Sequence, residues 1–337
     1  MRSVSLILVA YHGDRWVERC LRSLVEANNG DWRVILVDNG GNSDLRGLAQ
    51  GIAPGRIELV VSPGRLHFAE ANNFALLRGG MEADAVCFLN QDTVGRRGWL
   101  DACLATLNEN SAIGAVMPLI ENYEGTAWDS AFLTCARAAP ALAARLPAVT
   151  KAELADLPQF VPVPEITAAA MVVRAEVLRK VGPFDPIYES YYEDYDLCRR
   201  IIAAGYQVGI CTQGRIGHFG GSVTSDRRAY LRRARWITRN RVIYAARWQW
   251  KNRRLGLFRY LLLTMPRNGL RAFFGRSQTP FRAFVAAHGD LLGLLPRLAS
   301  IERDRREWEK YLATIGWRRP EWAPIANDVS STLCPKG

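Results

Sequence analysis

The sequence predicts an α/β protein built around a doubly wound sheet with helices on both faces. Along the first half of the chain, short apolar runs alternate with segments of helical periodicity, which is the pattern of β-α-β units. Polar residues directly follow several of these runs, as expected where strands end at one edge of a sheet. Of the 337 residues, 49% are hydrophobic and 23% charged, which excludes a disordered, collagen-like or coiled-coil chain.

The expected strands are continuous apolar runs bounded by polar residues, as in a sheet buried on both faces. They are Val4–Ala10, Trp32–Val37, Ile57–Val61, Ala85–Leu89, Thr167–Arg174 and Val208–Cys211. The segments between them repeat apolar residues at helical spacing, for example Val17, Cys20, Leu21 and Leu24 in the first one. We therefore expect helices over Asp14–Ala27, Ser43–Gln50, Glu70–Gly79, Trp99–Glu109 and Ala175–Val181.

Charge divides the chain into two regions. Residues 1–225 carry 20 Lys/Arg and 25 Asp/Glu, whereas residues 226–260 carry 12 basic residues and one acid, and residues 261–337 carry 12 and 7. We predict an α/β domain over 1–225, followed by a basic, Trp-containing helical region over 226–337 that has different partners.

The basic helical segment Tyr230–Arg254 has three interpretations. Arginines mixed with tryptophans suit an anionic membrane surface, which we favour. They also suit a solvated helix whose arginines serve phosphates or pair with the acidic domain. Nucleic-acid binding is the third interpretation, and we expect no nucleic-acid partner because no nucleic-acid motif accompanies the segment.

Cysteine usage and the N-terminus indicate the compartment. The seven cysteines are odd in number and form no C-x-x-C pair, which is typical of buried thiols in a reducing environment. The apolar run within Met1–Tyr11 is short and no small-residue cleavage site follows it, so we interpret it as a strand rather than a signal peptide. We expect a cytoplasmic protein, peripheral at the inner face of the plasma membrane if the basic region binds lipid.

Three polar groups follow predicted strands and form the candidate ligand edge. They are Tyr11-His12-Gly13-Asp14, Asp38-Asn39-Gly40 and Asn90-Gln91-Asp92. The chain has no G-x-G-x-x-G after its first strand and no P-loop motif, which argues against a dinucleotide-binding or P-loop enzyme. Asp38 is placed to hold a ribose or base, or else to form a turn, and Asp92 to bind Mg²⁺ or Mn²⁺ or to cap a helix.

Two further segments carry chemistry. Between Phe184 and Asp196, five carboxylates lie among five aromatic residues, and Glu193 and Asp194 begin a helix that continues through Leu197 and Ile201. A carboxylate among aromatic rings has a raised pKa and suits a general base, although acids also complement a helix dipole. The second segment is Gly217-His218-Phe219-Gly220-Gly221-Ser222, in which we interpret His218 as a metal ligand.

Together these motifs resemble the GT-A glycosyltransferases of family 2, in particular the rhamnosyltransferase-like branch. The resemblance covers roughly residues 3–250 and rests on six segments in order. They are Val9-Ala10-Tyr11-His12, Val37-Asp38-Asn39-Gly40, His67–Asn73, Leu89-Asn90-Gln91-Asp92-Thr93, Tyr191–Arg200 and His218–Ser222. It implies a GT-A fold with a mixed sheet and a C-terminal helical extension.

The resemblance also implies residue roles. Asp194 would be the catalytic base, and Glu193 would orient the acceptor or support that base. Asp92 and His218 would bind Mg²⁺ or Mn²⁺. The donor nucleotide would contact Ala10, Tyr11, Asp38, Asn39, Asn72, Asn73, Asn90 and Gln91, and the acceptor would contact Tyr191, Tyr192 and Ala169.

The implied function is an inverting, metal-dependent transfer of a sugar, with rhamnose suggested by the branch, from a nucleotide diphosphate to a hydroxyl group. The acceptor would be a growing bacterial surface glycan or a lipid-linked acceptor. One alternative keeps the fold but uses UDP-galactofuranose or a UDP-hexose. Another is a non-catalytic subunit that binds nucleotide or carbohydrate. A homo-oligomer is compatible with the sequence.

Overall fold

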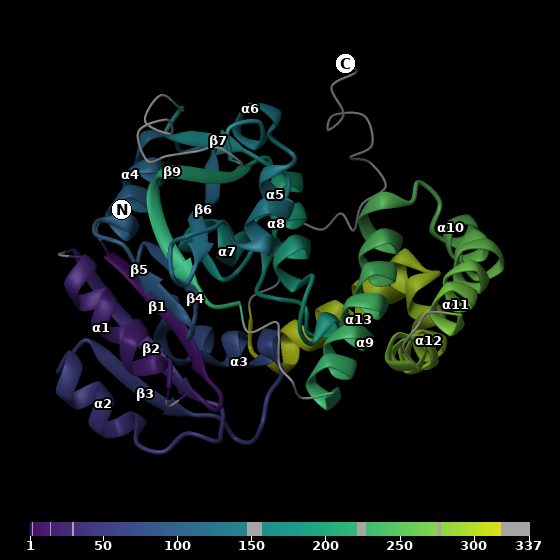
Figure 1. The fold of residues 1–337 in the computed structure, drawn as a ribbon, viewed down its shortest axis with the longest axis horizontal. Coiled ribbons are helices and arrows are strands. Elements are labelled where there is room, and N and C mark those ends of the chain that lie inside the picture. The colour runs from purple at the N-terminus through teal and green to yellow at the C-terminus, as the bar shows by residue number, and fades with distance from the viewer. Residues whose placement is uncertain are drawn as a thin grey trace. The chain divides into compact units, whose positions relative to one another are not determined.

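The computed structural model describes residues 1–317 except 2, 14, 29, 147–156, 221–226 and 275–277 (Figure 1). The chain forms two compact units. The first comprises Met1–Phe184 and Leu197–Gly221, and the second comprises Asp185–Asp196 and Ser222–Gly337. The domain boundary predicted between residues 225 and 226 falls outside the described residues. The second unit joins the predicted C-terminal region to Asp185–Asp196, the segment that is rich in acids and aromatic residues.

The first unit is organised by one nine-stranded mixed sheet in the order β3-β2-β1-β4-β8-β6-β9-β5, with β7 paired to β9. Parallel pairs join β3 to β2, β2 to β1 and β1 to β4, and β8 pairs with β4 in antiparallel orientation. The described strands are β1 Ser3–Ala10, β2 Asp31–Asp38, β3 Ile57–Val61, β4 Ala85–Asn90, β5 Thr93–Gly95, β6 Ile113–Asn122, β7 Phe160–Pro162, β8 Ala170–Arg174 and β9 Gln207–His218.

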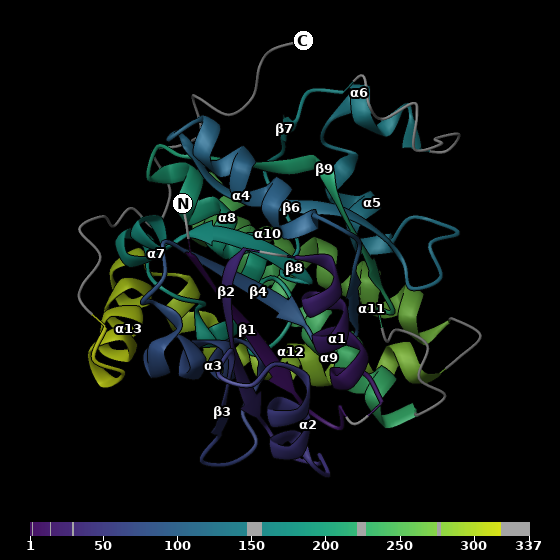
Figure 2. The same cartoon turned by 90° about the vertical axis from the view of Figure 1, so that its left-hand side faces the viewer.

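Helices cover both faces of this sheet (Figures 1 and 2). Helices α1 and α2 lie on one face and α3 on the other, because right-handed crossovers change face when the strand order reverses from β3 to β4. The described helices before β9 are α1 Val17–Ala27, α2 Leu45–Ile52, α3 Phe68–Ala75, α4 Trp99–Glu109, α5 Ser130–Ala136, α6 Pro140–Ala143, α7 Ala175–Val181 and α8 Glu193–Ala203.

The predicted α/β class is confirmed, and the burial of the strands explains why they form. Every residue of β4 except its last is buried, as is every residue of β8, so both strands are continuous apolar runs up to their last residues, Asn90 and Arg174. Helices α4 and α7 have the predicted bounds. Strand β9 is longer than predicted, because its second half contains polar residues that pair with β5 and β6.

The second unit is helical. It contains α9 Arg227–Tyr244, α10 Arg253–Arg259, α11 Met265–Phe273, α12 Gln278–Leu298 and α13 Ile301–Thr314, with π-helical turns at Ala245–Gln249 and Tyr260–Thr264. Its apolar core joins the 185–196 segment to these helices, because Tyr188 is fully buried in a cluster with Ile243, Leu291 and Leu298. Among the described helices, none is long and apolar enough to span a bilayer.

Candidate functional site

The carboxyl ends of three parallel strands bring the predicted donor residues to one edge of the sheet. In the strand register, Ala10 at the end of β1 pairs with Asp38 at the end of β2, and Val9 pairs with Asn90 at the end of β4. The backbone N–H of Asn90 also donates to the carbonyl of Ala169 at 3.0 Å. The sheet therefore places these residues together, as the positions of the strands predict.

The Asp38 carboxylate is oriented by its own turn. Its Oδ1 accepts hydrogen bonds from the Gly40 N–H at 3.0 Å and from Asn42 Nδ2 at 2.7 Å. Asn39 is buried, and both ends of its amide bond the backbone of Leu66, each at 2.9 Å. Asp38 thus presents a preorganised carboxylate, whereas Asn39 fixes the loop that follows β3.

Tyr11 and Gln91 hold the ends of β1 and β4 together. Gln91 accepts from the Tyr11 N–H and donates to the Tyr11 carbonyl, both at 3.0 Å. Gly13 follows, and a Cβ there would lie 2.3 Å from Gln91 Oε1 and 2.7 Å from Val17 Cγ2, so a larger residue would displace these side chains. The Arg65 guanidinium lies 4.6 Å from the centroid of the Tyr11 ring. Gln91 therefore stabilises the loop through its side chain.

Asn72 and Asn73 lie inside the first unit. The Asn73 amide donates to the Phe184 carbonyl at 2.7 Å and accepts from the Phe184 N–H at 3.0 Å. Asn72 donates to the Phe68 carbonyl at 2.8 Å within α3. Both side chains are almost fully buried, so the structure gives them backbone-anchoring contacts. Their predicted contact with the donor stays a prediction.

The predicted metal ligands lie side by side. His218 is the last residue of β9, and its Nε2 is 3.4 Å from Asp92 Oδ1 and 3.3 Å from Asn90 Nδ2. Its other ring nitrogen, Nδ1, is 3.3 Å from Asp129 Oδ2. Asp129 caps helix α5, since its Oδ1 accepts from the N–H groups of Ala131 and Phe132. Gly221 and Ser222, which complete the predicted motif, lie outside the described residues.

Asp129 was missed by sequence reasoning. Only a D-S pair before an apolar run marks it as a helix cap, and nothing local connects it with His218, 89 residues away. A carboxylate on Nδ1 fixes the ring orientation and leaves Nε2 facing Asp92, which is the arrangement found around histidines that bind metals.

The charges of this group are coupled. Burial by itself would lower the pKa of His218, but hydrogen bonds to Asp129 and Asp92 outweigh it and raise that pKa to about 9. Burial would raise the pKa of Asp129, and the interaction with His218 lowers it instead. A carboxylate oxygen and an imidazole nitrogen at this separation suit a divalent cation, although among the described residues no three His, Cys, Asp or Glu side chains are placed to hold one ion together.

In the second unit, the segment before α8 adopts an unusual backbone. Glu189, Tyr191 and Tyr192 all have positive φ angles, of 59°, 70° and 75°. For residues other than glycine, such conformations cost on the order of 1–3 kcal/mol each. The predicted acceptor residues Tyr191 and Tyr192 therefore belong to a loop that surrounding contacts must hold in place.

Helix α9 supplies those contacts. The Asn240 amide donates to the carbonyls of Tyr188 at 2.6 Å and of Ser190 and Tyr191 at 2.8 Å each. Arg239 forms an ion pair with Glu189 and donates to the Ile187 carbonyl at 2.8 Å. Both side chains are buried. Sequence reasoning missed Asn240 because nothing in the sequence marks which helix packs on this loop.

Glu193 and Asp194 begin α8, as predicted. Glu193 is 4% exposed, and its Oε2 has no hydrogen-bond partner among the described residues. Burial, together with the neighbouring charge of Asp194, raises the pKa of Glu193 well above its usual range. Burial of this kind favours the neutral form of a carboxyl group over the charged form. Asp194 is half-buried and accepts from the Tyr195 N–H at 2.9 Å.

A buried ion network fixes both ends of the same segment. Arg247 Nη2 lies 2.9 Å from Asp185 and 2.6 Å from Asp304, and its Nη1 lies 3.4 Å from Asp196. Arg253 and Arg297 also contact Asp304, at 3.1 and 2.8 Å. Burial would raise the pKa of Asp304, but the charges of Arg247 and Arg297 lower it far below its usual range. The arginines of the basic region thus serve partly to neutralise acids of their own unit.

Comparison with known proteins agrees with this architecture. The family model for glycosyl transferase family 2 matches residues 5–182, and that for glycosyl transferase family group 2 matches residues 157–295. The chain is 30% identical over 219 residues to the pre-mycofactocin glycosyltransferase of Mycobacterium tuberculosis, covering 65% of this chain but only 42% of the relative. It is 28% identical over 223 residues to the N-acetylglucosaminyl-diphospho-decaprenol L-rhamnosyltransferase of the same organism, covering 60% of this chain and 71% of the relative.

Solved structures show the same fold at low identity. The mannosyltransferase PcManGT from Pyrobaculum calidifontis, in complex with GDP-Man and Mn²⁺, superposes with a TM-score of 0.54 at 17% identity, over 93% of this chain and 85% of that one. S. aureus TarS in complex with UDP-GlcNAc superposes with a TM-score of 0.50 at 14% identity, over 93% and 92%.

A GT-A glycosyltransferase fold is therefore the class to which this architecture belongs. The chain itself is a member of glycosyl transferase family 2, because the family model matches more than half of its length.

Replacing Asp304 with alanine should strongly destabilise the second unit. The substitution leaves Arg247 buried with less compensation, and breaking a buried pair in this way costs about 3–5 kcal/mol. Urea unfolding followed by tryptophan fluorescence measures the loss. Asp290→Ala is the matched control, because its partner Arg235 is half exposed and the expected loss is below about 1 kcal/mol. Equal losses of unfolding free energy in the two variants would contradict a stabilising role for the buried Asp304 network.

Replacing Asp129 with asparagine should lower the pKa of His218 from about 9 towards 6.5, in protein without added metal. Asparagine still caps α5, so the fold should persist. Because the pKa of His218 is higher in the folded state, protonated His218 stabilises the fold. This contribution to the free energy of unfolding is complete below pH 6.5 and disappears as the pH rises through about 9. NMR titration of the His218 ring checks the pKa, and an unchanged titration midpoint would show that Asp129 does not act on the ring.

Proposed function

We propose that the chain transfers a sugar from a nucleotide diphosphate to a hydroxyl group, with inversion at the anomeric carbon. The observation that supports this most is the Asp92–His218–Asp129 arrangement beside the sheet edge that carries Asp38, in a chain of glycosyl transferase family 2. That edge is the region where open α/β sheets bind ligands.

The proposed reaction is a single displacement. Asp194 accepts the proton of the acceptor hydroxyl, the hydroxyl oxygen forms a bond to the anomeric carbon, and the bond from that carbon to the diphosphate oxygen breaks. The electron pair leaves with the nucleoside diphosphate. One base and no covalent intermediate give inversion. Glu193 would support Asp194 or orient the acceptor hydroxyl through its buried Oε2.

Asp92 and His218 Nε2 would hold Mg²⁺ or Mn²⁺, with Asp129 orienting the histidine from its other nitrogen. When bound, such an ion neutralises charge that develops on the departing diphosphate. Asp38, with its carboxylate fixed by Asn42, would contact the ribose or base of the nucleotide.

The relatives support a particular substrate class. One is named as a rhamnosyltransferase that acts on a diphospho-decaprenol-linked sugar, so we propose a rhamnosyl or similar hexosyl donor and a lipid-linked or glycan acceptor. Such an acceptor lies at a membrane surface.

Calorimetric binding of dTDP, UDP and GDP, each with and without Mn²⁺, should reveal one preferred nucleotide whose binding depends on Mn²⁺. Asp92→Ala should abolish that dependence, because it removes the carboxylate closest to His218 Nε2. Preference for dTDP supports a deoxysugar donor, and preference for UDP supports galactofuranose or a UDP-hexose. Failure to bind any of the three would count against the transferase proposal and favour a non-catalytic member.

Asp194→Asn should reduce turnover by about 10²–10⁴-fold while leaving nucleotide affinity unchanged, because asparagine cannot accept the hydroxyl proton. Single-turnover transfer with the preferred donor and a lipid-linked acceptor measures the rate, and calorimetry measures the affinity. Asp290→Asn, which changes a partly exposed carboxylate of the same unit, is the control. Full activity in Asp194→Asn would remove Asp194 from the mechanism.

A further inference from the structure

The helices of the second unit expose an apolar face that the packing of that unit leaves uncovered. Nine of the large hydrophobic side chains exposed among the described residues fall between positions 255 and 292. They are Leu255, Phe258, Leu262, Leu263, Leu270, Phe273, Phe274, Val285 and Leu292. Their exposed fractions reach 68% at Leu263 and 78% at Phe274. Exposed apolar side chains gathered on neighbouring helices are characteristic of an interaction surface.

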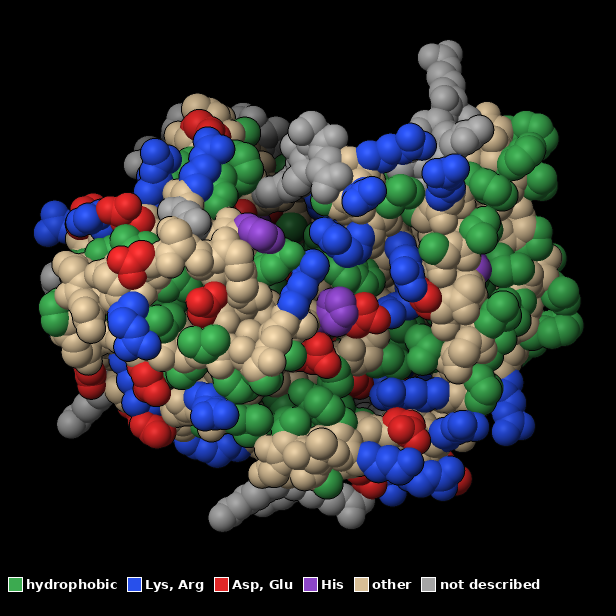
Figure 3. Space-filling model, turned by 90° about the horizontal axis from the view of Figure 1, so that it is seen from below, with side chains coloured by type: hydrophobic (Ala, Val, Ile, Leu, Met, Phe, Trp, Pro, Cys, Tyr) green, Lys and Arg blue, Asp and Glu red, His purple; other side chains and the backbone are tan. Residues whose placement is uncertain are grey.

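These side chains recur at helical spacing. Leu255, Phe258 and Leu262 are three and four residues apart along α10 and the following turn, and Leu263 and Leu270 are seven apart. On α12, Val285 and Leu292 are also seven apart, and α12 packs against α11. Side chains at such spacing share one side of a helix. Figure 3 shows green side chains gathered at the right-hand side of the molecule, interspersed with blue ones.

The charge of the helices that carry these side chains indicates which kind of surface they contact. From residue 227 to 289 the chain contains 16 Lys and Arg residues and no Asp or Glu. Arg239, Arg247 and Arg253 are buried with acids of the same unit, but Arg254, Arg259, Arg267, Arg271 and Arg282 are exposed on the helices that carry the apolar residues. Asp290, on α12 beside Leu292, is paired with Arg235. Leucine and phenylalanine side chains among such an excess of cations suit the headgroup region of an anionic bilayer.

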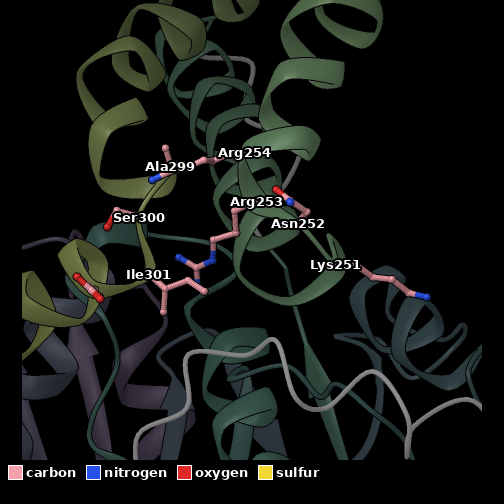
Figure 4. Close-up of a pocket in the computed structure, with 8 residues that line it drawn as sticks. Lys251, Asn252, Arg253, Arg254, Ala299, Ser300 and Ile301 are labelled. Atoms are coloured by element: carbon pink, nitrogen blue, oxygen red, sulfur yellow. The ribbon is translucent and has the colours of Figure 1, made fainter.

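A basic pocket lies at the start of this surface. It has a volume of about 410 Å³ and is lined by residues 251–254 and 299–302, at the beginnings of α10 and α13 (Figure 4). The lining includes Lys251, Arg253 and Arg254 against the single acid Glu302. Leu255 and Phe258 follow the pocket residues Arg253 and Arg254 along α10.

We propose that the apolar face of α10–α12 docks on an anionic lipid bilayer, with its leucines and phenylalanines inserted among the headgroups and its exposed arginines on lipid phosphates. This surface differs from the Tyr230–Arg254 segment predicted from sequence, three of whose arginines are buried in ion pairs. Docking extends the proposed function, because it would bring the chain to a lipid-linked acceptor. That role rests on the proposed function, whereas binding to the bilayer does not.

Vesicle co-sedimentation of the full chain tests the proposal. We expect binding to vesicles of equal phosphatidylglycerol and phosphatidylcholine, weaker binding to pure phosphatidylcholine, and a loss of binding at high salt. Leu262→Ser with Leu263→Ser should weaken binding at least about tenfold, and Arg267→Glu with Arg271→Glu should weaken it only on anionic vesicles. Val61→Ser with Leu77→Ser is the matched control, because these residues are similarly exposed in the first unit.

Three results would overturn the proposal. They are no binding of the wild-type chain to either vesicle, equal binding by Leu262→Ser with Leu263→Ser, or a solution dimer that this variant dissociates while vesicles bind neither protein. Nucleotide affinity, measured separately on the same samples, distinguishes failure of the lipid surface from failure of the proposed function.

Discussion

The buried charge of Asp304 is the constraint on which the second unit depends. A fully buried carboxylate requires compensation, and Arg247, Arg253 and Arg297 provide it from three different segments of the unit. Arg247 in turn contacts Asp185 and Asp196, which begin and end the segment that carries the proposed base. Trp248 and Tyr188 add hydrogen bonds to Asp196, at 2.8 and 3.2 Å. The C-terminal helices therefore determine the conformation of that segment.

The same helices maintain its strained backbone. Three residues with positive φ within four positions would relax in an isolated peptide, yet Asn240 donates to three carbonyl oxygens around them, those of Tyr188, Ser190 and Tyr191. Such strain is tolerated where neighbouring structure over-determines the conformation, and it is concentrated at functional sites. The basic helical region accordingly has two roles. Its buried arginines and Asn240 shape the loop before α8, and its exposed arginines and apolar side chains face outwards.

In the first unit, contacts from distant parts of the chain likewise fix one side chain, that of His218. His218 lies between two carboxylates, so one nitrogen is committed to Asp129 while the other faces Asp92 and Asn90. Asp129 reaches this position because it caps α5, the helix that follows β6, and β6 pairs with β9 up to His218 itself. The register between β6 and β9 thus places the residue that caps α5 next to His218.

The sequence by itself determined the α/β class, the parallel strands β1, β2 and β4, and the positions of Ala10, Asp38 and Asn90 at their carboxyl ends. These follow from local hydrophobic runs and from the fact that parallel strands end at a common edge. Its motifs also indicated Asp92 with His218, and Glu193 with Asp194. The tertiary structure alone decided which distant residues meet: Asp129 with His218, Asn240 with the loop before α8, and Asp304 with Arg247. Sheet register and helix packing set these contacts, and no local periodicity records either. Burial likewise decided which arginines form internal ion pairs and which remain on the surface, because all of them look alike in the sequence.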